Sequence, residues 1–223
     1  MFEWPVASKI DLETYPRRRL FEHFMSFEIP ITARTLQIDV TGLRSFTKRK
    51  ALRFSLTLGF LLTRASNYVP ELRHRIQDGV PVDYDRIIPS FTVLSEDQIV
   101  YFSKGVFTDS FEDDYPRNVE INARAALGLD QLTGPENQGQ IFITSVPWYS
   151  FTAIQHPYSR ENASIPVFSI GKIYEDNGRI KAPLGIQSHH AFVDGYHIGR
   201  FMEILERHLA APELIYHSST AGL

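Results

Sequence analysis

One short stretch, residues 187–200, constrains the fold more than any other because its pattern changes from that of a strand to that of a helix. The residues before the change, 183–188, read as a strand, and residues 198–209 repeat their apolar side chains at helical spacing. Between them stand two histidines, an aspartate and a glycine, in the order HHAFVDG. A strand therefore ends here and a helix begins, and such a junction can hold a polar side chain firmly while a ligand still reaches it.

The rest of the chain predicts one domain that spans residues 1–223. With 43% hydrophobic residues it can build a substantial core, and neither an internal repeat nor a linker divides it. We expect strands at residues 34–40, 80–84, 90–94, 99–102, 140–148, 165–174 and 179–188. We expect helices at residues 44–68 and 196–209, a helix within 111–129 that we place at 118–126, and a helical turn at 71–76. Residues 134–137 read as a loop, and the residues beyond 210 as a frayed tail.

Composition and charge exclude several classes of protein. The chain has no cysteine, which excludes disulfides, thiolate zinc sites and a cysteine nucleophile. A net charge of -3 without a long run of one sign argues against a general nucleic-acid surface. The most apolar stretch, residues 54–62, is too short to cross a membrane, and the N-terminus lacks the order of a signal peptide. We therefore expect a cytoplasmic protein with no nucleic-acid or membrane partner.

The paired histidines are open to three interpretations from the residues alone. One of them could be a general base, since an imidazole takes a proton near neutral pH. Both could equally be partly buried residues at a strand end, with no catalytic role. In the third interpretation the second histidine binds a metal, because His190, Asp194 and His197 could share a helical face. Neither an HExxH motif nor a cysteine ligand supports such a metal site.

The pattern HHAFVDG resembles HHxxxDG, which is shared by chloramphenicol acetyltransferases, the catalytic cores of dihydrolipoamide acyltransferases and the condensation domains of peptide synthetases. The first family is the most similar, because the segments QIDVTGL, PSFTV, QIFITSVPW and IPVFSIGKIY match it in order along nearly the whole chain. The resemblance implies a two-layer α/β sandwich in which a mixed β-sheet carries helices on one side. It also implies a homotrimer with active sites between subunits, and acetyl-coenzyme A as co-substrate without a metal.

The same resemblance assigns catalytic roles to four residues. His190, the second histidine of the motif, is implied to be the general base and to be oriented by its own backbone carbonyl. Asp194, which spacing alone would make a triad partner of His190, is implied to pair with Arg17 instead. Thr144 stands where the family has a serine whose hydroxyl binds the oxyanion, a role that a threonine hydroxyl also fills. His189 is implied to matter mainly to structure.

Ligand contacts follow from the resemblance as well. Lys172 and Arg53 stand where the family has lysines near phosphates of coenzyme A, although Arg53 could equally lie on a helix surface. Ser169 stands where a threonine hydroxyl holds a water. Phe24 and Thr32 replace a drug-binding tyrosine and a pocket phenylalanine, so a phenol donor and an aromatic wall are both missing.

The sequence therefore predicts an acyltransferase that moves an acetyl group from acetyl-coenzyme A to a hydroxyl of chloramphenicol or a related acceptor, in a ternary complex. One alternative is an acyltransferase for a different alcohol, amine or thiol. The lipoyl thiol is less favoured, because the dihydrolipoamide enzymes usually show DHRxxDG. An alternative of another class is a catalytically idle trimer that binds a ligand in the same cleft.

Overall fold

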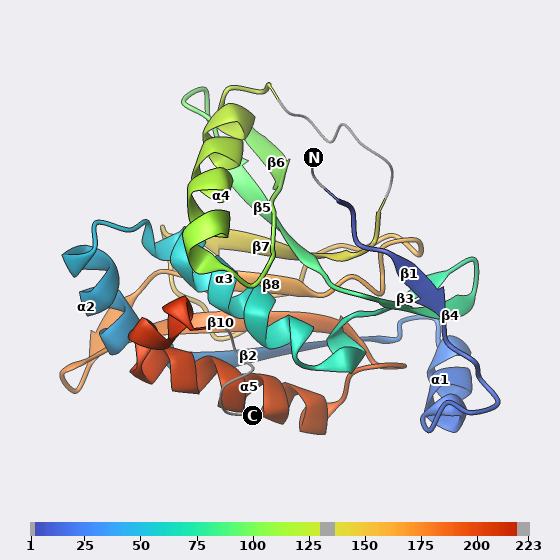
Figure 1. The fold of residues 1–223 in the computed structure, drawn as a ribbon. Helices are drawn as coiled ribbons and strands as arrows, with labels where there is room; N and C mark the ends of the chain where they lie inside the picture. Colours follow the sequence, from blue (N-terminus) through green and yellow to red (C-terminus); the bar gives the residue numbers. More distant parts are fainter. Residues whose placement is uncertain (1–2, 130–136, 218–223) are drawn as a thin grey trace.

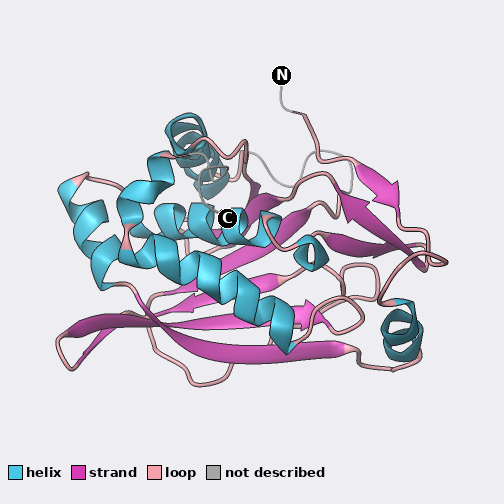
Figure 2. Cartoon of the chain, turned by 60° about the horizontal axis from the view of Figure 1, so that its bottom comes forward, coloured by secondary structure: helices cyan, strands magenta, loops and turns pink. Residues whose placement is uncertain are grey.

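The computed structural model describes residues 3–129 and 137–217, and these form a twisted β-sheet with a layer of helices on one face (Figures 1 and 2). Each layer buries its apolar side against the other, which is the usual way for an amphipathic helix and a sheet to form a core. The predicted α/β class, with a mixed sheet and helices on one side, is confirmed.

The large sheet contains β2 (Ile31–Asp39), β5 (Ile88–Leu94), β6 (Val100–Lys104), β7 (Gln140–Val146), β8 (Val167–Gly171), β9 (Tyr174–Asp176) and β10 (Arg179–His189). Across the described residues the strand order is β2-β10-β8-β7-β5-β6, and β9 pairs with β10 beside this path. β7 runs parallel to both β5 and β8, whereas the other pairs are antiparallel. The sheet is therefore mixed, and the long β10 lies near one edge with the HHAFVDG segment at its end.

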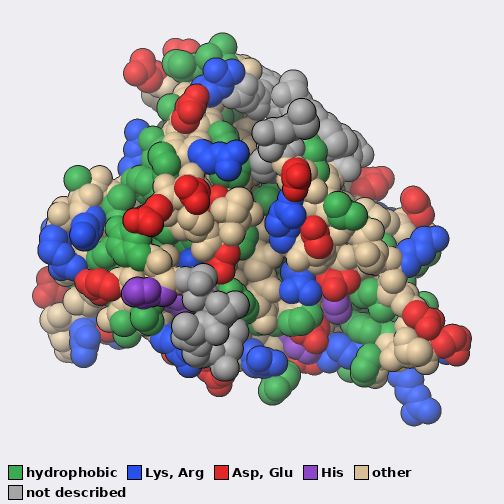
Figure 3. All heavy atoms as spheres, in the orientation of Figure 1, with side chains coloured by type: hydrophobic (Ala, Val, Ile, Leu, Met, Phe, Trp, Pro, Cys, Tyr) green, Lys and Arg blue, Asp and Glu red, His purple; other side chains and the backbone are tan. Residues whose placement is uncertain are grey.

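The helical layer contains α2 (Thr41–Arg49), α3 (Phe54–Asn67), α4 (Phe111–Ala126) and α5 (Gly195–Ala210). α3 contacts β5, β7 and α5, and α5 contacts β2, so these two helices cover the middle of the sheet. Acidic and basic side chains are interspersed over the face of the molecule in Figure 3, as expected of solvated helix surfaces. No helix among the described residues is both long and apolar enough to cross a membrane.

A second, smaller sheet adjoins the large one. It contains β1 (Ala7–Lys9), β3 (His74–Gln77) and β4 (Val80–Tyr84), in the antiparallel order β1-β4-β3. The helical turn predicted at residues 71–76 is therefore only partly present: a 3-10 turn, Pro70–Leu72, gives way to β3. α1 (Arg18–Met25) lies apart from the helical layer, next to the small sheet in Figure 1.

The single helix predicted at residues 44–68 is wrong, because the segment forms α2 and α3 with a corner between them. Ala51 has a φ of 54°, in the left-handed region, and Arg53 is extended with a ψ of 116°. Neither conformation continues a right-handed helix. The prediction missed the corner because apolar residues at helical spacing lie on both sides of it. Arg53 lies in the exposed turn just before α3.

Other boundaries differ from the prediction as well. The strand predicted at residues 165–174 is interrupted and forms β8 (Val167–Gly171) and β9 (Tyr174–Asp176). α4 begins at Phe111 and not at 118, because Ser110 caps it by accepting the N–H of Asp113, and three acidic residues occupy its first turn. The tail beyond residue 210 is not frayed where the structure describes it: Pro212–Tyr216 forms a 3-10 turn whose Ile215 is fully buried. Except for Asn137, the loop predicted at 134–137 lies outside the described residues.

The two faces of the large sheet differ. Ile143, Phe168 and Leu184 are buried on the face that the helices cover. Thr144 and Ser169, which follow the first two and are paired in register, point to the opposite face, because successive side chains alternate along a strand. We refer to this opposite side as the open face.

The loop that follows β7 packs against part of the open face. A Cβ atom on Gly185 would overlap Cγ2 of Ile154, and one on Gly171 would lie 2.8 Å from Cε1 of Phe151. Because only glycine lacks a Cβ, these two positions allow the loop to approach the backbone of β8 and β10 closely.

Candidate active site

Hydrogen bonds around Asp194 hold the junction between β10 and α5. Asp194 is the N-cap of α5: its Oδ1 accepts the N–H of Tyr196 at 2.9 Å, and its own N–H donates to Nδ1 of His197 at 3.1 Å. Such reciprocal capping supplies partners for groups that a helix leaves free at its start. The HHAFVDG segment is therefore a well-defined turn from strand to helix, as the change of pattern predicted.

His190 follows β10 directly and is half-buried. Its Nδ1 lies 3.0 Å from the carbonyl oxygen of Val193, and its ring stacks on Phe24 with the centroids 4.1 Å apart. The expectation that its own carbonyl orients the ring is wrong, because the turn after His190 brings the Val193 carbonyl back to Nδ1. A carbonyl oxygen only accepts, so Nδ1 carries the proton and the neutral ring has its lone pair on Nε2.

Arg17 and Asp194 are in contact. Nη1 of Arg17 lies 2.9 Å from Oδ2 of Asp194, and 17% and 31% of the two side chains remain exposed. Burial alone would raise the pKa of the Asp194 carboxyl, but the hydrogen bond from Arg17 and the charge of that guanidinium outweigh it and hold the pKa below its usual value. The pair therefore links the segment before α1 to the turn that contains His190.

Phe24 and Thr32, the predicted acceptor contacts, lie on the His190 side of the molecule. Phe24 belongs to α1 and stacks on His190. Thr32 belongs to β2, where it is the cross-strand partner of Ser188 and accepts a hydrogen bond from Nη1 of Arg34 at 2.8 Å. Both are thus brought close to the end of β10.

His189 lies inside the protein, with 4% of its surface exposed. Its Nδ1 accepts the N–H of Ala191 at 3.2 Å. Burial, with a smaller contribution from His190, lowers the pKa of His189 to about 4. A neutral imidazole enclosed in this way stabilises the turn and is poorly placed to meet a substrate.

The metal interpretation loses its geometric basis. α5 begins at Gly195, so His190 lies in the preceding turn and shares no helical face with Asp194 and His197. His197 is occupied on both sides, since Nδ1 accepts the N–H of Asp194 and Nε2 lies 3.4 Å from Oε1 of Glu71. Within residues 3–129 and 137–217, no group of three or more His, Asp or Glu side chains is arranged to hold a metal ion.

Thr144 lies in a different part of the chain, beside an open cavity of about 1340 Å³. Strands β5, β6 and β7 contribute side chains to the cavity from the open face, and the β3–β4 turn and residues 156–162 line its sides. Oγ1 of Thr144 accepts a hydrogen bond from Oγ1 of Thr92 at 2.8 Å. Because Thr92 is the donor in this contact, the hydroxyl proton of Thr144 is left for another acceptor.

His156, which sequence reasoning missed, lines the same cavity. Its Nε2 lies 2.6 Å from Oγ of Ser169, and its main chain is hydrogen-bonded to the side chain of Gln187. Ser169 is 1% exposed, so the imidazole covers the hydroxyl that was expected to hold a water. The loop that contains His156 has no periodicity, and no spacing in the sequence relates it to Ser169.

The strand register separates His190 from Thr144 within one chain. Thr144 is paired with Ser169 on β8, and Ser169 is paired with Gly185 on β10, five residues before His190. At about 3.4 Å per residue and about 4.8 Å per strand, the two side chains are about 20 Å apart. The residues predicted to act on the same carbonyl group therefore lie in two separate parts of the chain.

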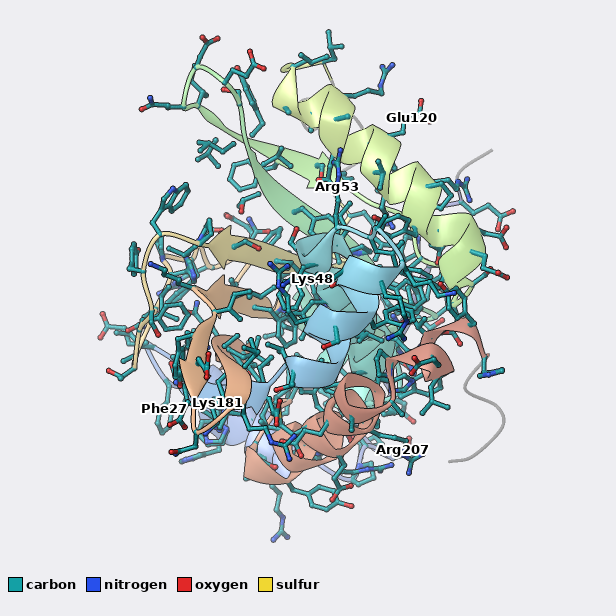
Figure 4. All side chains as sticks on the ribbon, turned by 90° about the vertical axis from the view of Figure 1, so that its left-hand side faces the viewer. Phe27, Lys48, Arg53, Glu120, Lys181 and Arg207 are labelled. Carbon is teal, nitrogen blue, oxygen red and sulfur yellow. The ribbon has the colours of Figure 1, made fainter. Side chains whose placement is uncertain are left out.

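Arg53 and Lys172, the predicted coenzyme contacts, are both exposed. Arg53 lies at the corner before α3, and Figure 4 shows it on the same side of the molecule as Lys48 of α2. Lys172 follows β8, and its N–H donates to the carbonyl of Tyr149 at 3.0 Å. The two basic residues thus come from the helical layer and from a strand end.

Comparison with known proteins gives consistent matches. The family model described as Chloramphenicol acetyltransferase matches residues 6–206. A chloramphenicol acetyltransferase of Clostridium perfringens is 32% identical over 200 residues, which are 86% of this chain and 90% of the relative. One from Klebsiella sp is 29% identical over 204 residues, 89% and 92% of the two chains. A solved structure of a chloramphenicol acetyltransferase has a TM-score of 0.80 and 25% identity, covering 92% of this chain and 100% of that one.

Proposed function

Because this chain belongs to the chloramphenicol acetyltransferase family and is an acyltransferase, we propose that it transfers an acetyl group from acetyl-coenzyme A to a hydroxyl of chloramphenicol or a related acceptor. The observation that carries the proposal is the orientation of His190. Its Nδ1 donates to the carbonyl of Val193, which leaves Nε2 as the proton acceptor of the ring. An imidazole in this state is suited to general base catalysis near neutral pH.

In the proposed reaction, Nε2 of His190 takes the proton of the acceptor hydroxyl while the oxygen attacks the thioester carbonyl carbon. As the C–O bond forms, the carbonyl oxygen becomes negative, and the hydroxyl proton of Thr144 stabilises it. Collapse of this tetrahedral intermediate breaks the C–S bond, and the thiolate of coenzyme A receives the proton from His190. The acetyl group passes directly between the two substrates, without an acyl-enzyme.

We propose that a second copy of the chain completes each site, in a homotrimer. About 20 Å separate His190 from Thr144 in one chain, whereas both must reach the same thioester carbonyl group. A head-to-tail arrangement that closes into a ring brings the His190 side of one subunit to the Thr144 cavity of the next. Three equivalent sites result, each between two subunits.

The coenzyme is proposed to bind with its phosphates near Arg53 and Lys172. Both side chains are exposed cations, and a guanidinium or an ammonium group pairs well with phosphate oxygens. Lys172 follows the same strand as Ser169, which neighbours Thr144 in the sheet. A thioester at Thr144 could therefore extend past the end of β8 toward Lys172.

The acceptor is proposed to lie against the ring of Phe24, next to His190. Phe24 offers aromatic contact but no phenol donor, and Thr32 offers no aromatic wall. We therefore expect chloramphenicol to be used with a raised Michaelis constant, or another alcohol to be preferred. The alternatives are transfer to an amine or a thiol, and a catalytically idle trimer that binds a ligand at the same place between two subunits.

The test is thiol release from acetyl-coenzyme A in the presence of a panel of hydroxyl acceptors. We expect release by the wild-type protein to depend on the acceptor and to be lost in His190→Ala, with an unchanged circular dichroism spectrum. Absence of release with every acceptor would favour the idle ligand-binding alternative. Release that His190→Ala leaves unchanged would remove His190 from the mechanism.

A further inference from the structure

Two histidines contact the same peptide group from opposite ends. Nδ1 of His190 lies 3.0 Å from the carbonyl oxygen of Val193, and the next N–H along the chain, that of Asp194, donates to Nδ1 of His197 at 3.1 Å. This C=O and this N–H belong to one planar unit. His197, which touches no reacting atom in the proposed reaction, is therefore linked through a single peptide bond to the group that orients His190.

The partners around His197 decide which of its nitrogens carries a proton. The N–H of Asp194 donates to Nδ1 and to no other acceptor within residues 3–129 and 137–217. Nδ1 also lies 2.9 Å from Oδ1 of Asp194, but both oxygens of that carboxylate have donors of their own, in Tyr196 and Arg17. Because a main-chain N–H in the interior needs an acceptor, Nδ1 has the lone pair and Nε2 has the proton. The ring of His197 is therefore neutral.

Glu71 lies at the protonated nitrogen of His197. Its Oε1 is 3.4 Å from Nε2 of His197, and 24% and 6% of the two side chains are exposed. The hydrogen bond from His197 lowers the pKa of Glu71 to about 2, so Glu71 is a carboxylate near neutral pH. The neighbours Val69 and Leu72 are buried, which fixes the 3-10 turn of Glu71 to the core. A charged group that only accepts is thus held at Nε2.

We propose that Glu71 and His197 are positioning residues that keep His190 in the tautomer with its lone pair on Nε2. The path begins at the carboxylate of Glu71 and passes through the imidazole of His197. It continues through the Val193–Asp194 peptide to the Nδ1–H of His190. Each hydrogen bond in such a chain polarises the next, so the charge of Glu71 makes the Val193 carbonyl a stronger acceptor, although no proton moves along the path. The inference rests on the proposed acetyl transfer, in which that lone pair takes the proton of the acceptor.

A capping role alone makes a different prediction for the same contacts. Glutamate or glutamine often binds the N–H of the capping residue from the position that His197 occupies, and such a role does not involve Glu71. Replacing Glu71 would then change stability without affecting the ring of His190. The charge of Glu71 therefore distinguishes a positioning role from a capping role.

The first test measures the tautomers directly, in protein labelled with nitrogen-15 at histidine. Nuclear magnetic resonance correlations between ring nitrogens and ring protons distinguish the two neutral tautomers from the charged ring. Signals that disappear in His190→Ala and in His197→Gln assign the two residues. In wild type near neutral pH, we expect the proton of His190 on Nδ1 and that of His197 on Nε2.

Glu71→Gln is the decisive variant, because it keeps an acceptor for His197 and loses only the charge. It should give His190 a measurable fraction of the other tautomer and lower kcat by about 3- to 10-fold. KM should change little, because Glu71 contacts no substrate in the proposed site. The control is Glu213→Gln, in a second Pro-Glu-Leu 3-10 turn, where Glu213 pairs with an exposed Arg49. This control should leave both the tautomer and kcat unchanged.

Two replacements of His197 complete the comparison. His197→Phe should lower kcat at least as much as Glu71→Gln, because the N–H of Asp194 loses its acceptor. His197→Gln, which restores an acceptor, should recover most of that loss and return His190 toward the wild-type tautomer. Thermal denaturation checks that each variant is folded at the assay temperature.

Unchanged signals of His190 in folded Glu71→Gln and His197→Phe would overturn the inference. Protons on both nitrogens of His197 in wild type would overturn it as well, since a charged ring cannot accept the N–H of Asp194. If the wild type acetylates no acceptor, the proposed function fails, and the resonance comparison, which needs no substrate, still decides the inference. Should His197→Phe not fold, Glu71→Gln decides it by the same criterion.

Discussion

Nη1 of Arg17 and Oδ2 of Asp194 lie 2.9 Å apart, although 177 positions separate the two residues in the sequence. The contact ties the segment before α1 to the turn between β10 and α5. Because that turn holds the ring of His190 through the Val193 carbonyl, the ion pair stabilises the geometry on which proton transfer would depend.

Removing either partner should leave a partly buried charge alone. Arg17→Ala and Asp194→Asn, the latter chosen because it keeps a capping side chain, should each lower the free energy of unfolding by about 1 to 3 kcal/mol. The double variant should cost less than the sum, as measured by chemical denaturation. Arg18→Ala is the control, since its partners Glu13 and Glu22 are exposed and little change is expected. Small and additive losses would show that the contact contributes nothing.

His190 and His189 should respond differently to replacement. His190→Ala should lower kcat by about 10²- to 10⁴-fold, the usual contribution of a general base, and should leave the circular dichroism spectrum unchanged. His189→Asn keeps an acceptor for the N–H of Ala191, so its activity should stay within a few-fold of wild type. Steady-state kinetics distinguishes the two, and the reverse order of effects would assign the base to His189.

Thr144 should depend on its hydroxyl and less on its methyl group. Thr144→Val should lower kcat by about 10²-fold, the scale of one lost oxyanion donor, and Thr144→Ser should stay close to wild type. Thr92→Val should have a smaller effect of about 3- to 10-fold, because Thr144 keeps its proton and loses only the donor that orients it. Full activity of Thr144→Val would make the residue a strand component alone.

Sites shared between subunits predict complementation. His190→Ala and Thr144→Val chains, unfolded together and refolded as an equimolar mixture, should recover about one quarter of wild-type activity, because that fraction of random interfaces pairs two intact residues. Each variant refolded by itself is the control and should stay at or below about one hundredth of wild-type activity. Light scattering should give three times the chain mass of 25.6 kDa. A mass of one chain, or no recovery by a mixture that has exchanged subunits, would place both residues in a single-chain site.

Stability should fall in two stages as the pH is lowered. Burial lowers the pKa of His189 and of His74 from 6.5 to about 4. Between these values the unfolded chain binds protons that the folded chain does not, so the free energy of unfolding should decrease, by at most about 3 kcal/mol for each histidine. The hydrogen bond with His197 lowers the pKa of Glu71 from 4.5 to about 2, so its contribution is complete above 4.5 and is lost toward 2.

Urea denaturation at a series of pH values measures both stages. His189→Asn should flatten the slope between pH 6.5 and about 4 and leave the lower stage in place. Glu71→Gln should weaken the lower stage, and because the charge of Glu71 raises the pKa of His74, it should also extend the upper stage toward lower pH. A stability profile that is level from pH 6.5 to 4 would contradict the assignment of neutral, buried histidines.

Local patterns in the sequence were sufficient to predict the main strands and helices of the fold. The change of period around residue 190 predicted the end of β10 and the start of α5, because strand and helix repeat their apolar residues at different intervals. The Asn177-Gly178 pair, a typical signal of a two-residue hairpin turn, lies between β9 and β10, and both residues have positive φ, 50° and 73°, as such a turn requires. The HHAFVDG motif and its matching segments led to the family and the enzyme class.

Tertiary structure alone decided the corner at Ala51, the packing of Ile215 and the carbonyl that holds His190. The apolar spacing continues across the corner, so it could not predict the positive φ of Ala51. The segment after α5 is ordered because Ile215 is buried against the helical layer. His156 meets Ser169 through a loop without periodicity, so no rule of local spacing could find it. The separation of His190 from Thr144 follows from strand order and register. These are fixed by packing between residues distant in the sequence, whereas a local pattern fixes only which face of its own element each side chain occupies.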